Sequence, residues 1–161
     1  METLSFDLLQ FLYHLALAIL VGGSLVLGTA VAPVLFASSR SRAEAGALFG
    51  TVLARFDGLA IFSVIVLTIT SVFKALGFEV IGAPDTRLVL RWFALAALSV
   101  ATLYSSAWAN PVARQIRAAT AGFDEQPQSS PARTEFARLH QRSRRAMSVA
   151  VVFGLLALFL G

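Results

Sequence analysis

The sequence of 161 residues contains no cysteine, two histidines and a single lysine, and charged residues make up only 14% of it. Without cysteine, the chain cannot form a disulfide, a thiolate metal site, a cysteine-ligated iron–sulfur cluster or a thiol nucleophile. No stretch matches a motif that is typical of a catalytic centre, so we expect no enzymatic activity. Hydrophobic residues make up 57% of the sequence and the mean hydropathy is +0.76, both above the values of soluble domains.

The abundant feature is the long apolar run. The first run has 32 uncharged residues from Leu8 to Ser39, whereas about 20 apolar residues suffice to cross a hydrocarbon core of roughly 30 Å. Three further runs follow. Together they predict an all-α integral membrane four-helix bundle in a single domain, with spans near residues 8–37, 57–77, 86–109 and 143–160.

Two segments between the spans have a different composition. Residues 42–55 carry apolar side chains on one side and Glu44, Thr51 and Arg55 on the other, which predicts an interfacial amphipathic helix, either separate from the second span or continuous with it. Residues 122–131, GFDEQPQSSP, are poor in hydrophobic residues and contain proline and serine. We therefore expect a mobile loop over residues 120–133.

The basic residues predict an orientation. Four spans place the first and third connections on one side, and that side with its flanking helix ends holds ten arginines against three basic residues on the other. The ten are Arg40, Arg42, Arg55, Arg114, Arg117, Arg133, Arg138, Arg142, Arg144 and Arg145, and the three are Lys74, Arg87 and Arg91. Because lysine and arginine are enriched in cytoplasmic connections, we expect both chain termini outside, in a bacterial inner (cytoplasmic) membrane.

The net charge of +4 bears on partners. In a soluble protein this balance would raise the question of nucleic acid, but here the basic residues lie at helix ends, so anionic lipid headgroups are the expected partner and nucleic acid is not. Arg138, Arg142 and Arg145 share one face before the last span and are the candidates for headgroup contact.

The first span has small and polar side chains on one face. At the helical repeat of 3.6 residues these are His14, Ala18, Gly22, Leu25, Thr29 and Ala32. Small residues let helices approach closely in a membrane, so this face is expected to pack on a neighbouring helix. The polar residues expected on the packed faces of the other spans are Asp57, Thr102, Ser105 and Arg144.

His14 is the residue that separates the functional classes. Imidazole is a common haem or metal ligand, so one alternative is a membrane redox protein that uses His14. His140 is expected near the opposite membrane surface, about 30 Å away, so the two histidines cannot share a metal. The favoured interpretation is that His14 forms a hydrogen bond between helices and binds no cofactor within one protomer.

Asp57 and Arg144 are expected at the same membrane surface, which predicts an ion pair between them. A proton relay at Asp57 is the alternative. Hydroxyls such as those of Thr102 and Ser105 would suit a polar cavity in a small-solute transporter, but the internal repeats and broken helices of transporters are not evident.

Three segments resemble, in chain order, the transmembrane-protein-205-like family of small four-helix membrane proteins. They are LYHLALAILVGGSLVLGTAVAPVLF, RAEAGALFGTVLARFDGL and FARLHQRSRRAMSVAVVFGLLAL. The family's Leu-His-x-x-Ser element is matched by Leu139, His140 and Ser143, whereas residues 146–148 (AMS) depart from the Leu-Asn pair expected shortly after it. The resemblance implies a four-helix bundle without a settled activity. Some four-helix relatives in haem-binding and copper-resistance families have a similar early histidine, which keeps the redox alternative open.

The sequence as a whole favours a non-enzymatic polytopic membrane protein. We expect a structural or accessory component of a membrane complex or of a homo-oligomer. The alternatives are a haem- or metal-binding redox protein that uses His14 and, second, a small-solute transporter.

Overall fold

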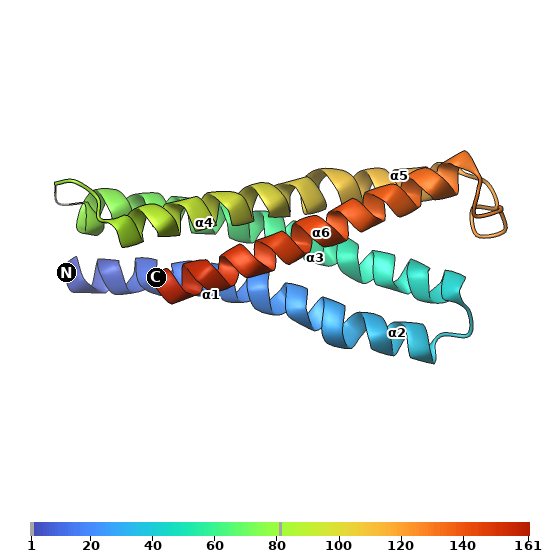
Figure 1. Cartoon of the computed structure of the whole chain (residues 1–161). Helices are drawn as coiled ribbons and strands as arrows, with labels where there is room; N and C mark the ends of the chain where they lie inside the picture. Colours follow the sequence, from blue (N-terminus) through green and yellow to red (C-terminus); the bar gives the residue numbers. More distant parts are fainter. Residues whose placement is uncertain (1, 81) are drawn as a thin grey trace.

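The chain folds into four long helical rods joined by short connections in a computed structural model that describes residues 2–80 and 82–161 (Figure 1). All regular structure in the described residues is helical, which confirms the predicted all-α fold. Each rod is long and apolar enough to cross a membrane, so the prediction of four candidate membrane helices is confirmed as well.

Short π-helical segments interrupt two of the rods and end a third. The first rod comprises α1 (Glu2–Val26), the π-helical η1 (Leu27–Val31) and α2 (Ala32–Ser38). The second comprises α3 (Arg42–Lys74) and the π-helical η2 (Ala75–Glu79). The third comprises α4 (Thr86–Leu103), the π-helical η3 (Tyr104–Ala109) and α5 (Asn110–Ala119), and the fourth is α6 (Pro131–Leu160).

The starts of three helices follow the rules of N-terminal capping. The Ser41 hydroxyl accepts a hydrogen bond from the Glu44 amide at 3.1 Å, and the Glu44 carboxylate accepts one from the Arg40 amide at 2.9 Å. The Asp85 carboxylate accepts from the Leu88 amide at 2.7 Å and so caps α4, and Ser130 followed by proline opens α6. These contacts satisfy amides that have no partner within the helix.

Two rods run further than the apolar patterns indicate. The amphipathic segment 42–55 is the start of α3 and continues into the second span without a break. Pro111 does not end the third rod, because it occupies the first turn of α5, where a missing amide donor costs little. The π-helical turn η3 just before it rearranges the backbone hydrogen bonds and keeps the rod continuous.

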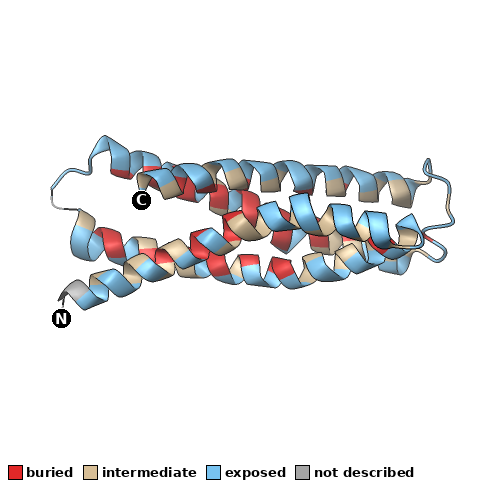
Figure 2. Ribbon diagram, turned by 90° about the horizontal axis from the view of Figure 1, so that it is seen from below, coloured by how far each residue is buried: buried red, intermediate tan, exposed pale blue. Residues whose placement is uncertain are grey.

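The hydrophobic core lies between α1, α3, α4 and α6. Figure 2 shows the buried residues along the inner faces of the rods, mainly in their central stretch. The core cluster consists of Tyr13, Ala16, Leu17, Leu20, Phe56, Ala60, Val64, Leu67, Ala94, Leu95, Leu98 and Ala157. At Gly154 of α6, an added Cβ would overlap Val21 and lie 2.9 Å from the Leu98 side chain, so α1, α4 and α6 come very close there.

The end of the first rod leaves this core. None of the residues 27–38, all of them described, is buried. The main contacts of α2 outside its own rod are with α3, including the Phe36 and Phe49 rings, whose centroids are 6.4 Å apart. Figure 1 shows α2 diverging from α5 and α6.

The connection between α5 and α6 is held at several points. Phe123 is buried with its ring centroid 5.2 Å from that of Phe136, and the Arg133 guanidinium donates to the carbonyl oxygens of Phe123 and Asp124 at 3.2 and 3.0 Å. The Asp124 carboxylate also pairs with Arg117 at 2.6 Å. The mobility expected for residues 120–133 stays a prediction, and α6 already begins within that range at Pro131.

Candidate functional site

Ten polar or charged side chains are buried in the described part of the chain, and six of them belong to two separate clusters. The Asp57 cluster comprises Asp57, Ser105, Asn110, Arg114 and Ser143. The Lys74 cluster comprises Gln10, Tyr13, Lys74, Glu79 and Arg91. Asp57 and Lys74 are 17 residues apart on α3, so about 26 Å of helix separates the two clusters.

The Asp57 cluster is a directed chain of hydrogen bonds. Arg114 Nη1 lies 2.6 Å from one Asp57 carboxylate oxygen, and Asn110 Nδ2 donates to the other at 2.8 Å. The Ser143 hydroxyl donates to Asn110 Oδ1 at 2.6 Å. Because that bond uses the only proton of Ser143, Ser105 must be the donor in the 2.7 Å contact between the two hydroxyls. Every donor in the chain therefore points towards the Asp57 carboxylate.

This chain joins three rods. Asp57 lies on α3, Ser105, Asn110 and Arg114 lie on the third rod, and Ser143 lies on α6. The Asp57 side chain is 4% exposed and that of Arg114 is 36% exposed, so the cluster reaches the surface only at the guanidinium. The ion pair and the hydrogen bonds of this cluster hold the three rods in register.

Two hydroxyls near this cluster are buried without a hydrogen-bond partner among the described residues. They belong to Ser106, one turn before Asn110, and to Ser63, six residues after Asp57. Serines in helices often donate to the carbonyl four residues earlier, as Ser24 does to Leu20 at 2.6 Å. The interior beside the Asp57 cluster therefore holds unused hydrogen-bonding capacity.

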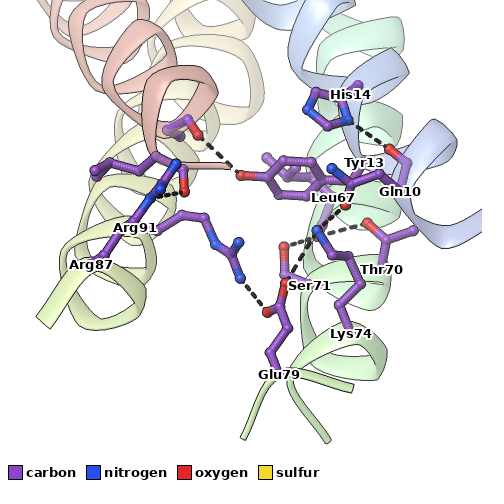
Figure 3. A network of polar contacts seen from close by, with 12 residues as sticks. Gln10, Tyr13, His14, Leu67, Thr70, Ser71, Lys74, Glu79, Arg87 and Arg91 are labelled. Atoms are coloured by element: carbon purple, nitrogen blue, oxygen red, sulfur yellow. Dashed lines mark hydrogen bonds and ion pairs between the residues drawn. The ribbon is translucent and has the colours of Figure 1, made fainter. Parts of the chain in front are cut away.

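The Lys74 cluster lies towards the other end of α3 and contains the single lysine of the chain (Figure 3). Lys74 Nζ lies 3.3 Å from Glu79 Oε1, contacts Gln10 Oε1 and lies 4.5 Å from the centroid of the Tyr13 ring. Arg91 of α4 pairs through Nη2 with the second Glu79 oxygen. Glu79 ends η2, so the π-helical turn brings its carboxylate between cations of two rods.

This second cluster is buried and unbalanced in charge. The side chains of Lys74, Arg91 and Glu79 are 2%, 9% and 16% exposed. Among the described side chains, two cations share one carboxylate. Arg91 Nε is buried without a hydrogen-bond partner in the described part of the chain. Unpaired cationic donors are costly in an apolar interior, so this group is the one most suited to hold a ligand.

The predicted pair between Asp57 and Arg144 is wrong. Asp57 pairs with Arg114, which lies in the extension of the third rod beyond the predicted span. Arg144 is exposed, because α6 turns the neighbouring residue Ser143 inwards and one residue along a helix rotates the side chain by about 100°.

The predicted hydrogen bond of His14 to another helix is also wrong. His14 Nδ1 lies 2.9 Å from the carbonyl oxygen of Gln10 in its own helix, and its ring meets the Tyr13 ring edge-on at a centroid distance of 5.2 Å. No group of three or more His, Asp or Glu side chains within the described residues could hold a metal ion.

The small-residue face of the first rod points outwards, not towards the other rods of the protomer. Ala18, Leu25 and Thr29 are exposed, and His14, Gly22 and Ala32 are half-buried. An added Cβ at Gly22 would meet no described atom within 4 Å, and the Thr29 hydroxyl donates to the Leu25 carbonyl of its own helix at 2.7 Å. The face that packs inwards instead carries Tyr13, Leu17 and Leu20, whose larger side chains fill the core.

The remaining predicted residues are either buried or exposed. Thr102 and Ser105 are buried, at 1% and 0% exposure, as their place on a packed face predicts. Arg138, Arg142 and Arg145 are exposed, and Arg138 pairs with Glu135 at 2.7 Å. Their contact with lipid headgroups stays a prediction.

Sequence reasoning missed most members of both clusters. Asn110 and Arg114 fall after the predicted end of the third span, and Gln10 and Glu79 look like ordinary polar residues near helix ends. The one signal that could have pointed to a site was the solitary lysine at the end of an apolar run, close in sequence to Glu79 and on the same expected side as Arg91.

Comparison with known protein families gives one match. Residues 15–121 match the family described as "Domain of unknown function (DUF4149)". No curated protein and no solved structure matches the chain. The matched range contains Asp57, Asn110 and Arg114 of one cluster and Lys74, Glu79 and Arg91 of the other, whereas Tyr13 and Ser143 lie outside it. Because the match covers about two thirds of the sequence, the chain belongs to the DUF4149 family of unknown function.

Proposed function

We propose that this polytopic membrane protein is a non-enzymatic, structural or accessory component that assembles with a second copy of itself through the outward face of its first rod. The observation that carries the proposal is that the small-residue face of α1, η1 and α2 is exposed or half-buried, and that an added Cβ at Gly22 would meet no described atom. The resemblance to the transmembrane-protein-205-like family favours the same general class of small four-helix membrane proteins.

The residues on that face suit helix packing better than contact with lipid. Gly22 offers open space for a neighbouring backbone, since an added Cβ there would meet no described atom within 4 Å, and the same is true of the exposed Gly28 beside that face. Small residues of this kind are enriched where membrane helices pack on each other. The divergence of residues 27–38 from the core adds a surface that the protomer itself leaves uncovered. A second copy is the partner we infer, because symmetric homodimers are the commonest assemblies.

The absence of cysteine allows a direct test. Thr29→Cys places one thiol on the proposed face, and Val100→Cys, at a position 69% exposed on α4, serves as the matched control. Under mild oxidation in native membranes, we expect a disulfide-linked dimer from Thr29→Cys and little from Val100→Cys. Equal crosslinking at both positions, or none at Thr29→Cys, would contradict the proposal.

The redox alternative uses the same face, since His14 is half-buried there and its partner ligand would have to come from another chain. An absorption spectrum of the purified dimer separates the two functions. A Soret band that disappears in His14→Ala would favour the haem alternative over a purely structural role.

We further propose a bacterial inner membrane as the location, with the connections 39–41 and 120–130 in the cytoplasm and both chain termini outside. The ten-to-three distribution of basic residues supports this orientation. Gly161 lies beside Tyr13 of α1, in the half of the bundle that contains the start of α1, whereas Met1 lies outside the described residues (Figure 1). The exposed Arg138, Arg142 and Arg145 would then face anionic headgroups of the cytoplasmic leaflet.

A further inference from the structure

We propose that the Lys74 cluster is a binding site for an oxyanion, namely the phosphate of a phospholipid headgroup or free phosphate. This site is distinct from the packing face of the first rod, and its occupancy does not depend on assembly. Three observations carry the proposal: the unbalanced charge, the free edge of the Arg91 guanidinium and the position of the cluster along the bundle.

The two cations of the Lys74 cluster outnumber its one carboxylate, which favours binding of a second anion. Lys74 and Arg91 are both more than nine-tenths buried, and Glu79 is the only described carboxylate that contacts them. The Tyr13 ring lies 4.5 Å from Lys74 Nζ and 5.9 Å from Arg91 Cζ, so its face offsets part of the positive charge. One carboxylate and one aromatic face leave about one positive charge uncompensated in an apolar surrounding, where a mobile anion would be bound strongly.

The Arg91 guanidinium has donors suited to an oxyanion. An arginine presents Nε and Nη2 along one edge, and this edge can hold two oxygens of a phosphate or carboxylate. Glu79 engages Nη2 alone, and Nε has no partner among the described residues. A phosphate oxygen at Nε would complete the use of that edge.

The cluster also lies where phosphate is abundant. It is near the bundle end that carries the start of α1, and Glu79 leads directly into the exposed connection before α4. About 26 Å of helix separates it from Asp57, close to the roughly 30 Å thickness of a hydrocarbon core. If Asp57 lies at one membrane surface, Lys74 lies near the headgroups of the other. Glu79, the most exposed of the three charged groups, marks the side from which the anion enters.

The test measures the melting temperature of the purified full-length chain in detergent. One series adds inorganic phosphate at constant ionic strength, and the other adds short-chain phosphatidylglycerol or, as its control, diacylglycerol with the same acyl chains. At about 100 times the dissociation constant, we expect a rise in Tm of about 5–10 °C. A rise with phosphate indicates free phosphate as ligand, and a rise only with phosphatidylglycerol indicates the lipid headgroup.

Three variants make the test specific. Arg91→Gln should abolish the rise, whereas Arg87→Gln should retain it, because Arg87 lies one turn away at the surface and donates to the Leu160 carbonyl. Glu79→Gln should lower the starting Tm and enlarge the rise, since it releases both cations for the added anion. A purely structural cluster predicts the lower Tm without any anion dependence.

Two results would overturn the proposal. One is an unchanged Tm with both additives in the wild type and in Glu79→Gln, which decides the question even if Arg91→Gln does not fold. The other is a rise in Arg91→Gln as large as in Arg87→Gln, which would show that the added anion acts on the surface charge.

Discussion

Among single residues, Asn110 connects Asp57 of α3 with Ser143 of α6. It donates to the Asp57 carboxylate and accepts from the Ser143 hydroxyl, at 2.8 and 2.6 Å. A carboxylate in its place would repel Asp57, and an apolar side chain would leave both partners unsatisfied. A primary amide supplies both a donor and an acceptor without charge.

Removing the charge of Asp57 should destabilise the bundle. In Asp57→Asn the ion pair with Arg114 is lost and the interior amide contacts are rearranged. Loss of a fully buried pair costs about 3–5 kcal/mol, and the partial exposure of Arg114 reduces this to about 1–3 kcal/mol. Thermal unfolding in detergent measures the change.

Arg144→Gln is the control for this prediction. Arg144 is exposed and forms no ion pair with Asp57, so its removal should leave the unfolding free energy within about 0.5 kcal/mol of the wild type. A larger loss in Arg144→Gln than in Asp57→Asn would contradict the observed pairing.

The buried serines should respond differently to the same substitution. Ser143→Ala leaves the Asn110 carbonyl oxygen and the Ser105 hydroxyl without their partner, which costs about 1–3 kcal/mol. Ser63→Ala and Ser106→Ala remove hydroxyls that have no partner among the described residues, so they should be neutral or stabilising. Equal losses in all three variants, measured by thermal unfolding, would contradict the hydrogen-bond assignment.

The sequence predicts which residues are buried better than it predicts their hydrogen-bond partners, because a partner depends on the exact direction of the side chain. Burial of Asp57, Thr102 and Ser105 followed from their apolar surroundings. The partner of Asp57 did not, because Ser143 and Arg144 are adjacent in sequence but differ by about 100° around the helix. A pattern of side-chain types tolerates such a rotation, whereas a hydrogen bond does not.

At the scale of the helices, three π-helical turns depart from the uniform repeat that a sequence pattern assumes. Each of η1 and η3 precedes a proline, and η2 carries Glu79 towards Lys74 and Arg91. A π-helical turn accommodates an extra residue, so it shifts the faces on either side relative to each other. The apolar runs therefore predict the rods correctly, whereas a uniform repeat of 3.6 residues cannot locate these turns.

The tightest contact between rods gives a further prediction. Gly154→Ala would place a methyl group onto Val21 and 2.9 Å from Leu98, so it should destabilise the protein by about 1–3 kcal/mol. Gly58→Ala is the matched control, since its Cβ would meet no described atom within 4 Å and alanine favours a helix by up to about 1 kcal/mol. Thermal unfolding of both variants checks that Gly154→Ala lowers the free energy of unfolding and that Gly58→Ala raises it.

Considered as a whole, the molecule is longer than a membrane is thick. The second rod, Arg42–Glu79, has 38 residues and is therefore about 57 Å long, whereas a hydrocarbon core is roughly 30 Å thick. If the Asp57 and Lys74 clusters lie near the two membrane surfaces, as proposed above, the excess length projects on the side of the connections 39–41 and 120–130. Most of the arginines lie in that projecting part, which explains why charge is scarce in the sequence yet abundant at one end.

This arrangement predicts which connection is accessible from each side of the membrane. Because the chain has no cysteine, single thiols at Pro84→Cys and Ser129→Cys report on the exposed connections before α4 and before α6. In intact cells, a maleimide that cannot cross the membrane should label Pro84→Cys and leave Ser129→Cys unlabelled until the cells are opened. The excess of arginine on the side of Ser129 gives the physical reason, since lysine and arginine near short connections resist transfer across the membrane. Labelling of Ser129→Cys alone in intact cells would reverse the orientation and would place the Lys74 cluster at the cytoplasmic leaflet, where anionic phospholipid would remain available to it.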